Sequence, residues 1–354
     1  MDAQNISSRL AAWIEHRYPG SDPKLINVKP PSQGYSNETW LLDLQWIKQG
    51  RAETVPLVLR IAPENSAIFQ HYDLSLQYRV MDALANSDVP VPALFGYEDD
   101  ISVIGRPFFL MLRIDGRVPD EDPLYHMSGW LHDLHGEEQA AHWLRGVEMT
   151  ATIAKLDWRA SELDFLAPPV GTALDANLAE LADFLAWTES LARPYPLLHR
   201  ALEYLQTHRP PVYAEVLVWG DAKLGNCLYA AGDIVAVLDW ECAHIGHPLE
   251  DLAWWIVLDR SLCDGYNVAR LANLPSREAS IARWQAVSGM PVTDLPYFEL
   301  MAALRLAIIM ARVGKLFTER GRVTADAEMD INNGGAAILA LLMNEQDITC
   351  NAAC

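Results

Sequence analysis

Short stretches rich in β-branched and aromatic residues dominate the first part of the chain and predict strands. We expect these strands at residues 25–30, 39–47, 54–61, 93–97 and 107–112. Apolar positions at helical spacing predict one helix at the N-terminus, over residues 1–18, and another over residues 72–85. The first 112 residues are therefore expected to form a small β-rich lobe.

The pattern changes after residue 112, where long segments carry helical periodicity. Helices are expected over residues 129–156, 177–188, 198–207, 277–288 and 297–318, with short strands at 216–219, 227–230 and 234–238. A chain of 354 residues also exceeds what one compact core usually contains. We predict an α+β protein of two lobes, an N-lobe over residues 1–112 and a C-lobe over residues 113–354.

Composition narrows the class of protein. The chain is 51% hydrophobic and 21% charged, which excludes disordered and fibrous proteins. Its net charge of −20 argues against nucleic acid as a partner. Five cysteines without a CxxC motif predict free thiols in a reducing compartment. The charged N-terminus is not a secretion signal, and the longest apolar run, residues 301–311, contains Arg305 and is too short to cross a bilayer. We expect a cytoplasmic protein that does not enter a membrane; the sequence does not indicate an oligomeric state.

Three oxygen-bearing side chains follow short apolar strands in the C-lobe. Asp221 comes directly after a predicted strand, and Asn226 follows five residues later. Asp239 comes directly after the predicted strand at 234–238. If these strands fold back on each other, the three side chains meet. Carboxylate and amide oxygens are the ligands that Mg²⁺ prefers.

This spacing matches the scheme of phosphoryl transfer. In kinases an Asp accepts the proton of the attacking hydroxyl, and an Asn five residues on, with an Asp from the next hairpin, holds the metal ions. Lys223, in the same loop, can neutralise charge on the transferred group. A turn in which Asp221 and Asn226 only bond their own backbone is the structural alternative. The chain contains neither GxSxG nor a P-loop motif, which disfavours a serine hydrolase and a P-loop enzyme.

The stretch WGDAKLGNCLY, followed by VAVLDWE and GHPLEDLA, resembles the catalytic motif of the aminoglycoside phosphotransferase family. It is most similar to the branch that supplies the kinase-like domain of some animal acyl-CoA dehydrogenase fusion proteins. The resemblance implies a bilobal protein-kinase-like fold with ATP in the cleft. It assigns Asp221 as the catalytic base, Asn226 and Asp239 as Mg²⁺ ligands, and Lys223 as the loop cation. Asp251 corresponds to an acidic residue that braces the catalytic loop from the next helix.

The same resemblance assigns nucleotide-binding residues in the N-lobe. Ser32 and Gly34 fall in the segment that covers the phosphates, although a plain hairpin turn explains them equally well. Arg60 stands where kinases place a strand lysine that grips the α- and β-phosphates, and it can also be an ordinary strand residue. The segment that includes Met111, Leu112 and Ile114 resembles the hinge, where adenine would bond the backbone of Leu112 and Ile114.

Two residues depart from the family pattern. Gln77 stands where a glutamate should pair with the strand cation, and Asp73, one turn earlier, is a possible substitute. Trp219 stands in place of a histidine that supports the catalytic loop. We therefore keep two expectations: an ATP- and Mg²⁺-dependent phosphotransferase acting on the hydroxyl of a small molecule, and a nucleotide-binding pseudokinase that serves as a regulator or scaffold.

The acceptor is not fixed by the sequence. Acidic runs at 98–100 and 120–122 suit an amino sugar if they line the pocket, although solvation explains them as well. The fusion relatives point instead to a hydroxyacyl-CoA. His244 and His247 lack a third ligand at zinc-site spacing, so we expect them to be structural. Most of the twelve tryptophans, including the pair at 254–255, are expected in the core.

Overall fold

The computed structural model describes residues 3–29, 38–64, 68–211 and 214–348. The chain divides into two compact units, Met1–Asp115 and Gly116–Cys354. The boundary that we expected, after residue 112, lies close to this division. Within the described residues, no helix is both long enough and apolar enough to span a bilayer.

The first unit is built on an antiparallel sheet in the order β1-β2-β3-β5-β4. Its strands are β1 (Lys24–Lys29), β2 (Glu38–Lys48), β3 (Arg51–Ile61), β4 (Leu94–Glu98) and β5 (Phe108–Leu112), and its helices are α1 (Ala3–Arg17), α2 (Leu74–Leu84) and α3 (Ile101–Ile104). The β2–β3 hairpin turns at Gln49 and Gly50, which both have positive φ. This is the turn whose twist matches that of the strands, so the pairing stays in register from Lys48↔Arg51 to Glu38↔Ile61.

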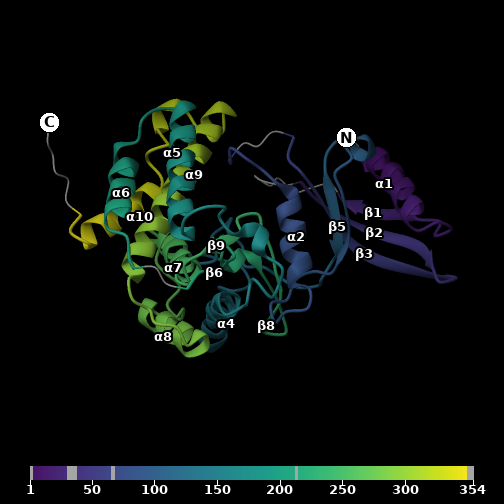
Figure 1. Ribbon diagram of the computed structural model, residues 1–354, viewed down its shortest axis with the longest axis horizontal. Helices are drawn as coiled ribbons and strands as arrows, with labels where there is room; N and C mark the ends of the chain where they lie inside the picture. The colour runs from purple at the N-terminus through teal and green to yellow at the C-terminus, as the bar shows by residue number, and fades with distance from the viewer. Residues whose placement is uncertain (1–2, 30–37, 65–67, 212–213, 349–354) are drawn as a thin grey trace. The chain divides into compact units, whose positions relative to one another are not determined.

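Helices α1 and α2 cover opposite faces of this sheet, and β5 lies between them in Figure 1. Successive side chains of a strand point to opposite faces. Phe108 of β5 contacts Trp13 of α1, with ring centroids 5.1 Å apart, whereas Phe109 lies 6.0 Å from Tyr78 of α2. Arg60 pairs with Phe109 across the sheet and therefore faces the α2 side.

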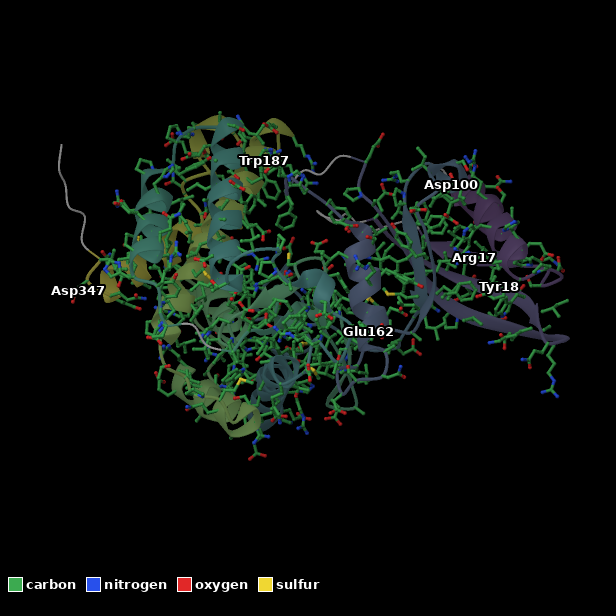
Figure 2. The ribbon with its side chains drawn as sticks, in the orientation of Figure 1. Arg17, Tyr18, Asp100, Glu162, Trp187 and Asp347 are labelled. Atoms are coloured by element: carbon green, nitrogen blue, oxygen red, sulfur yellow. The ribbon has the colours of Figure 1, made fainter. Side chains whose placement is uncertain are left out.

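The apolar core of the first unit lies on the α1 face. Ile6, Leu10 and Ile14 of α1 are buried there against alternate residues of β2, β3 and β5. Arg17 and Tyr18, labelled in Figure 2, lie at the end of α1: the Arg17 guanidinium lies 4.3 Å from the Trp13 ring centre, and Tyr18 contacts Trp46. Burial of this face holds the sheet and α1 together as one layer on another.

The second unit is mainly helical (Figure 1). Its helices are α4 (Gly136–Ala154), α5 (Ala173–Ser190), α6 (Pro196–Thr207), α7 (Glu250–Cys263), α8 (Arg277–Ser288), α9 (Leu295–Glu319) and α10 (Gly334–Glu345), with 3₁₀ turns at Asp164–Leu166, Leu224–Asn226 and Ala325–Ala327. Two short strand pairs accompany them: β6 (Val216–Val218) with β9 (His244–Gly246), and β7 (Cys227–Ala230) with β8 (Asp233–Val237). Both pairs are antiparallel.

Helix α10 of this unit was not predicted, and the predictions for two other helices were also inaccurate. Helix α4 begins at Gly136 and not at residue 129, because His135 is its N-cap and forms a capping box with Glu138. Helix α7 was not recognised from periodicity. Nearly all its residues are buried, Leu252 to Val257 without a break, so no polar stripe marks an exposed face.

Candidate active site

The loop between β6 and β7 contains three of the residues for which a catalytic role was predicted, Asp221, Lys223 and Asn226. Strand β6 is held by pairing with β9, and the chain then turns at Gly220, where φ is +86°. Any Cβ at this position would collide with the carbonyl oxygen of Cys242. Only glycine combines this φ with this space, and the turn places Asp221 directly after the buried strand.

Asp221 and Asn226 are in direct contact. The Asn226 Nδ2 donates to Asp221 Oδ2 at 2.7 Å and to the Asp221 carbonyl at 3.0 Å. The amide is almost fully buried, and its Oδ1 is left on the side away from these bonds. The Asn226 carbonyl in turn accepts from the Leu238 N–H at 2.9 Å, so the end of β8 lies beside the loop. Asp239, which follows Leu238 with a φ of +62°, therefore has its backbone next to this loop, and its charge acts on Lys223.

Lys223 lies between two carboxylates. Its Nζ is 3.7 Å from Asp221 Oδ2 and 3.2 Å from Glu121 Oε1. Burial by itself would lower the pKa of Lys223, but the charges of Asp221 and Glu121, with a contribution from Asp239, outweigh burial and raise it. The ammonium is therefore charged at every physiological pH and lies next to the predicted base.

The predicted brace is present in helix α7. Asp251 Oδ2 accepts from the Trp219 N–H at 2.8 Å, and its Oδ1 accepts from the Gly220 N–H at 2.9 Å. Burial raises the pKa of Asp251 to about 6, although the two N–H donors oppose this rise. Trp219, the departure from the family histidine, is fully buried, and its Nε1 donates to the Leu238 carbonyl at 2.9 Å. It thus ties the end of β6 to the end of β8.

Three residues that touch this loop were not assigned to it from the sequence. They are Glu121, which reaches Lys223, Trp254 of α7, which reaches the Asp221 carboxylate, and Arg305 of α9, which reaches the Gly220 carbonyl. A usable signal existed for Trp254, because it lies three residues after Asp251 and therefore on the same helix face. No local pattern relates Glu121 or Arg305 to a loop some hundred residues away in sequence.

The two histidines near the loop have structural partners. His244 Nε2 lies 3.0 Å from Glu250 Oε2, and its Nδ1 lies 2.9 Å from the Cys242 carbonyl. Burial would lower the pKa of His244, but the Glu250 carboxylate outweighs it and raises the pKa. His247 stacks on Phe298 at 4.0 Å between ring centres, and burial lowers its pKa to about 4. Both observations fit the structural roles that we expected.

The predicted phosphate residues of the first unit are only partly described. Ser32 and Gly34 lie outside the described residues. Arg60 Nη1 donates to Thr39 Oγ1 at 2.9 Å, from the α2 face of β3. Gln77 is buried in α2, and its Nε2 lies 3.5 Å from the Tyr72 hydroxyl. A hydrogen bond between Arg60 and Gln77 stays a prediction.

Asp73 has a local role at the start of α2. It is the N-cap of α2, and its Oδ1 accepts from the Ser75 N–H at 2.8 Å and from the Ser75 hydroxyl at 2.6 Å. A cap of this kind satisfies a backbone donor that the helix itself leaves unpaired. Asp73 Oδ1 therefore serves the helix start. A pairing of Asp73 with Arg60 stays a prediction.

The hinge segment offers a restricted set of backbone groups. The Leu112 N–H donates to the Ala93 carbonyl at 2.8 Å, and the Arg113 N–H donates to the Pro56 carbonyl at 3.0 Å. Of the two backbone groups of Leu112, only its carbonyl can serve an incoming base. Within the described residues, the Ile114 N–H donates no backbone hydrogen bond. The Met111 side chain points to the same sheet face as Arg60, whereas that of Leu112 points to the α1 core.

The two acidic runs differ in what they contact. Glu98 accepts from the Trp13 indole at 2.6 Å, and Asp100 caps α3 through the Ser102 N–H. The acidic residues Glu98 and Asp100 therefore stabilise the local structure of the first unit. In the second run, Glu121 approaches Lys223 and packs against Gly225 of the catalytic loop. Surface solvation alone does not explain the position of Glu121.

Within the described residues, one further buried cluster has the composition of a metal site. His126 Nε2, Asp259 and Cys263 Sγ offer ligand atoms within 4.8 Å of one another. However, the Leu271 N–H donates to His126 Nδ1 at 3.3 Å, so the neutral ring carries its proton on Nε2, the atom that would have to bind the metal. Arg270 already neutralises Asp259 at 2.6 Å. We interpret the cluster as a hydrogen-bonded network.

Comparison with known proteins gives the family. Residues 27–283 match the model of the phosphotransferase enzyme family, APH. The chain belongs to this family. This membership confirms the resemblance on which the catalytic residues were assigned.

Relatives of this chain agree with the predicted branch. Acyl-CoA dehydrogenase family member 11 of Gallus gallus is 28% identical over 305 residues, which cover 82% of the chain and 37% of that protein. Acyl-CoA dehydrogenase family member 10 of Mus musculus is 27% identical over 232 residues, which cover 62% of the chain and 19% of that protein. The chain thus spans well under half of the length of the curated relatives it matches.

A solved structure confirms the α+β, kinase-like fold. A proposed aminoglycoside phosphotransferase from Ralstonia eutropha superposes with a TM-score of 0.72 at 23% identity, over 96% of this chain and 98% of that one. A thermostable aminoglycoside phosphotransferase crystallised with AMP-PNP and hygromycin B is also similar.

Proposed function

We propose that this protein transfers the γ-phosphate of ATP to a hydroxyl group of a small molecule, with Mg²⁺ as cofactor. The observation that carries the proposal is the direct contact between Asp221 and Asn226, together with the backbone bond from Asn226 to Leu238 that brings Asp239 beside them. A general base and two oxygen ligands for a metal ion are then supplied within one loop and the adjoining strand end.

Asp221 is proposed to accept the proton of the acceptor hydroxyl. Its carboxylate is about a quarter exposed, so that an acceptor can approach it, while Asn226 holds one of its oxygens. Lys223 is proposed to bind the transferred phosphoryl group, which it can do from its position 3.7 Å from Asp221. Phosphoryl transfer depends mainly on positioning of the reactants and on stabilisation of the developing charge. Asp221 is proposed to supply the first and Lys223 the second.

The donor set suits Mg²⁺. Asn226 uses its Nδ2 to bond Asp221, which leaves the amide Oδ1 as a ligand, and Asp239 adds a carboxylate. Hard oxygen donors with room for water and phosphate oxygens are what Mg²⁺ requires. When bound, the ion neutralises charge on the phosphates.

For the nucleotide we propose contacts from the first unit. Arg60 is assigned to the α- and β-phosphates, since an arginine retains its charge and can bind two phosphate oxygens at once. The Leu112 carbonyl and the Ile114 N–H are assigned to adenine; the Leu112 N–H is already bonded to Ala93. Ser32 and Gly34 remain candidates for the segment that covers the phosphates.

Two classes of acceptor are proposed for testing. A structural neighbour was crystallised with hygromycin B, an observation that favours an amino sugar. The acyl-CoA dehydrogenase relatives favour a hydroxyacyl-CoA.

The experiment is a transfer assay with MgATP and three acceptors in turn: hygromycin B, 3-hydroxybutyryl-CoA and glycerol. ADP release is measured together with the mass of the phosphorylated product. We expect transfer to at least one acceptor, and a loss of at least about 100-fold in Asp221→Asn, which removes the base but keeps the volume. Asp183→Asn, an exposed carboxylate of α5 outside the site, is the matched control. Full transfer by Asp221→Asn would exclude Asp221 as the base.

A pseudokinase is the second candidate, and the replacement of the expected glutamate by the buried Gln77 favours it. An amide can hydrogen-bond to Arg60 but cannot form an ion pair with it. The same assay separates the two functions. Nucleotide binding without transfer to any acceptor, combined with no effect of Asp221→Asn on binding, would favour a scaffold or regulator.

A further inference from the structure

We propose that Trp254 is a positioning residue for the catalytic carboxylate, a role that rests on the proposed function of Asp221 as the base. The indole Nε1 of Trp254 donates to Asp221 Oδ1 at 3.1 Å. Asn226 Nδ2 donates to the other oxygen, Oδ2, at 2.7 Å. With a separate donor on each oxygen, the plane of the carboxylate is fixed, and each oxygen keeps a lone pair for a further partner.

The placement of Trp254 follows from the same helix that braces the loop backbone. Asp251 and Trp254 are three residues apart in α7 and lie on one face. Asp251 accepts from the Trp219 and Gly220 N–H groups, and Trp254 binds the side chain of the next residue, Asp221. One helical turn therefore fixes both the backbone of the catalytic loop and the orientation of its carboxylate.

Arg305 of α9 holds the indole from another side. Its guanidinium lies 4.8 Å from the Trp254 ring centre, and its Nη1 donates to the Gly220 carbonyl at 2.5 Å. Trp254 itself is 5% exposed. A buried ring, packed against a cation that is anchored to the same loop, has little freedom to turn its N–H away from Asp221.

The neighbouring residue provides a matched control. Trp255 is equally buried in α7, but within the described residues its Nε1 has no hydrogen-bond partner. Its ring packs on Trp143, with centroids 5.3 Å apart, and against Gly146 of α4. Replacing either tryptophan by phenylalanine removes similar buried area from the same helix, and only the change at 254 removes a donor from Asp221.

The experiment compares Trp254→Phe with Trp255→Phe. We expect Trp254→Phe to lower kcat by about 10- to 100-fold, the effect of losing a hydrogen bond to a charged group, with the KM for ATP unchanged. Trp255→Phe should keep kcat within about twofold of wild type. Its unfolding temperature should fall by about as much as that of Trp254→Phe. Transfer is measured with MgATP and hygromycin B, 3-hydroxybutyryl-CoA or glycerol. If the phenylalanine variant fails to fold, Trp254→Leu, which also lacks the donor, replaces it.

A second measurement does not depend on turnover. In ¹⁵N-labelled protein, the indole N–H resonance that Trp254→Phe deletes should shift and exchange faster in Asp221→Ala, whereas the Trp255 resonance should not move. The positioning role alone is overturned if Trp254→Phe has the same kcat as wild type. It is also overturned if the Trp254 indole N–H resonance is unchanged in Asp221→Ala. No transfer by the wild type to any acceptor, with the resonance still responding to Asp221→Ala, overturns the proposed function and leaves the contact as a structural one.

Discussion

At the scale of single residues, the unexpected feature of the site is the ion pair between Lys223 and Glu121. Lys223 is the cation proposed to bind the transferred phosphoryl group, yet its Nζ lies closer to Glu121 than to Asp221. A carboxylate and a phosphate compete for the same ammonium group. Glu121 is nearly half exposed, so the ion pair is worth only a modest free energy.

We therefore predict that Glu121→Gln strengthens the interaction with ATP. The KM for ATP should fall by a factor of about 1.4 to 5, which corresponds to the roughly 0.2–1 kcal/mol of an exposed ion pair. Steady-state kinetics with varied ATP measures it, with Glu203→Gln, an exposed change on α6, as the control. A higher KM for ATP in Glu121→Gln would show instead that Glu121 helps to hold the nucleotide or its acceptor.

At the scale of elements, the start of α7 is fixed by a buried ion pair. Glu250 lies 3.0 Å from His244 Nε2 on β9, and Asn177 of α5 donates to the same carboxylate at 3.3 Å. Burial raises the pKa of Glu250, but His244 outweighs this effect and the pKa is lowered, while that of His244 is raised. The ion pair therefore stabilises the native state where His244 is protonated and Glu250 is ionised.

The pH dependence of stability follows from these shifts. Because the native pKa of His244 lies above its ordinary value of 6.5, the contribution is complete below about pH 6.5 and is lost as the pH rises through the native pKa. In urea unfolding, the free energy of unfolding of wild type should exceed that of His244→Gln by a larger margin at about pH 5.5 than at about pH 9. A difference that stays constant between these pH values would mean that the pKa of His244 is the same in the native and unfolded states.

Elements with local signals were predicted closely from the sequence. Helix α8 has the predicted bounds, since Ser276 caps its start and Gly289, in the left-handed region, ends it. Helix α7 was missed because burial on all sides removes its periodicity. The loop residues Asp221, Asn226 and Asp239 were found because their spacing is local, whereas Glu121 and Arg305 reach the loop only through tertiary packing.

At the scale of the whole molecule, the proposed roles are divided between two compact units. Asp221, Lys223, Asn226 and Asp239 belong to the second unit, and Arg60, Leu112 and Ile114 to the first. A ligand that binds the native state and not the unfolded chain raises the free energy of unfolding, by about 2.7 kcal/mol at a concentration 100 times its Kd. Nucleotide and metal should therefore stabilise the whole protein, and the metal-dependent part of this stabilisation should depend on Asp239.

We predict that AMP-PNP with Mg²⁺ raises the unfolding temperature more than AMP-PNP with EDTA. Asp239→Asn should lose this Mg²⁺-dependent increment, because an amide is a weaker ligand than a carboxylate for a hard cation. Its unfolding temperature without ligand should stay near that of wild type, since asparagine also tolerates the φ of +62° at this position. Differential scanning fluorimetry measures both, with Asp183→Asn as the control. A full Mg²⁺-dependent increment in Asp239→Asn would remove Asp239 from the metal site, while leaving the role of Asp221 open to the transfer assay.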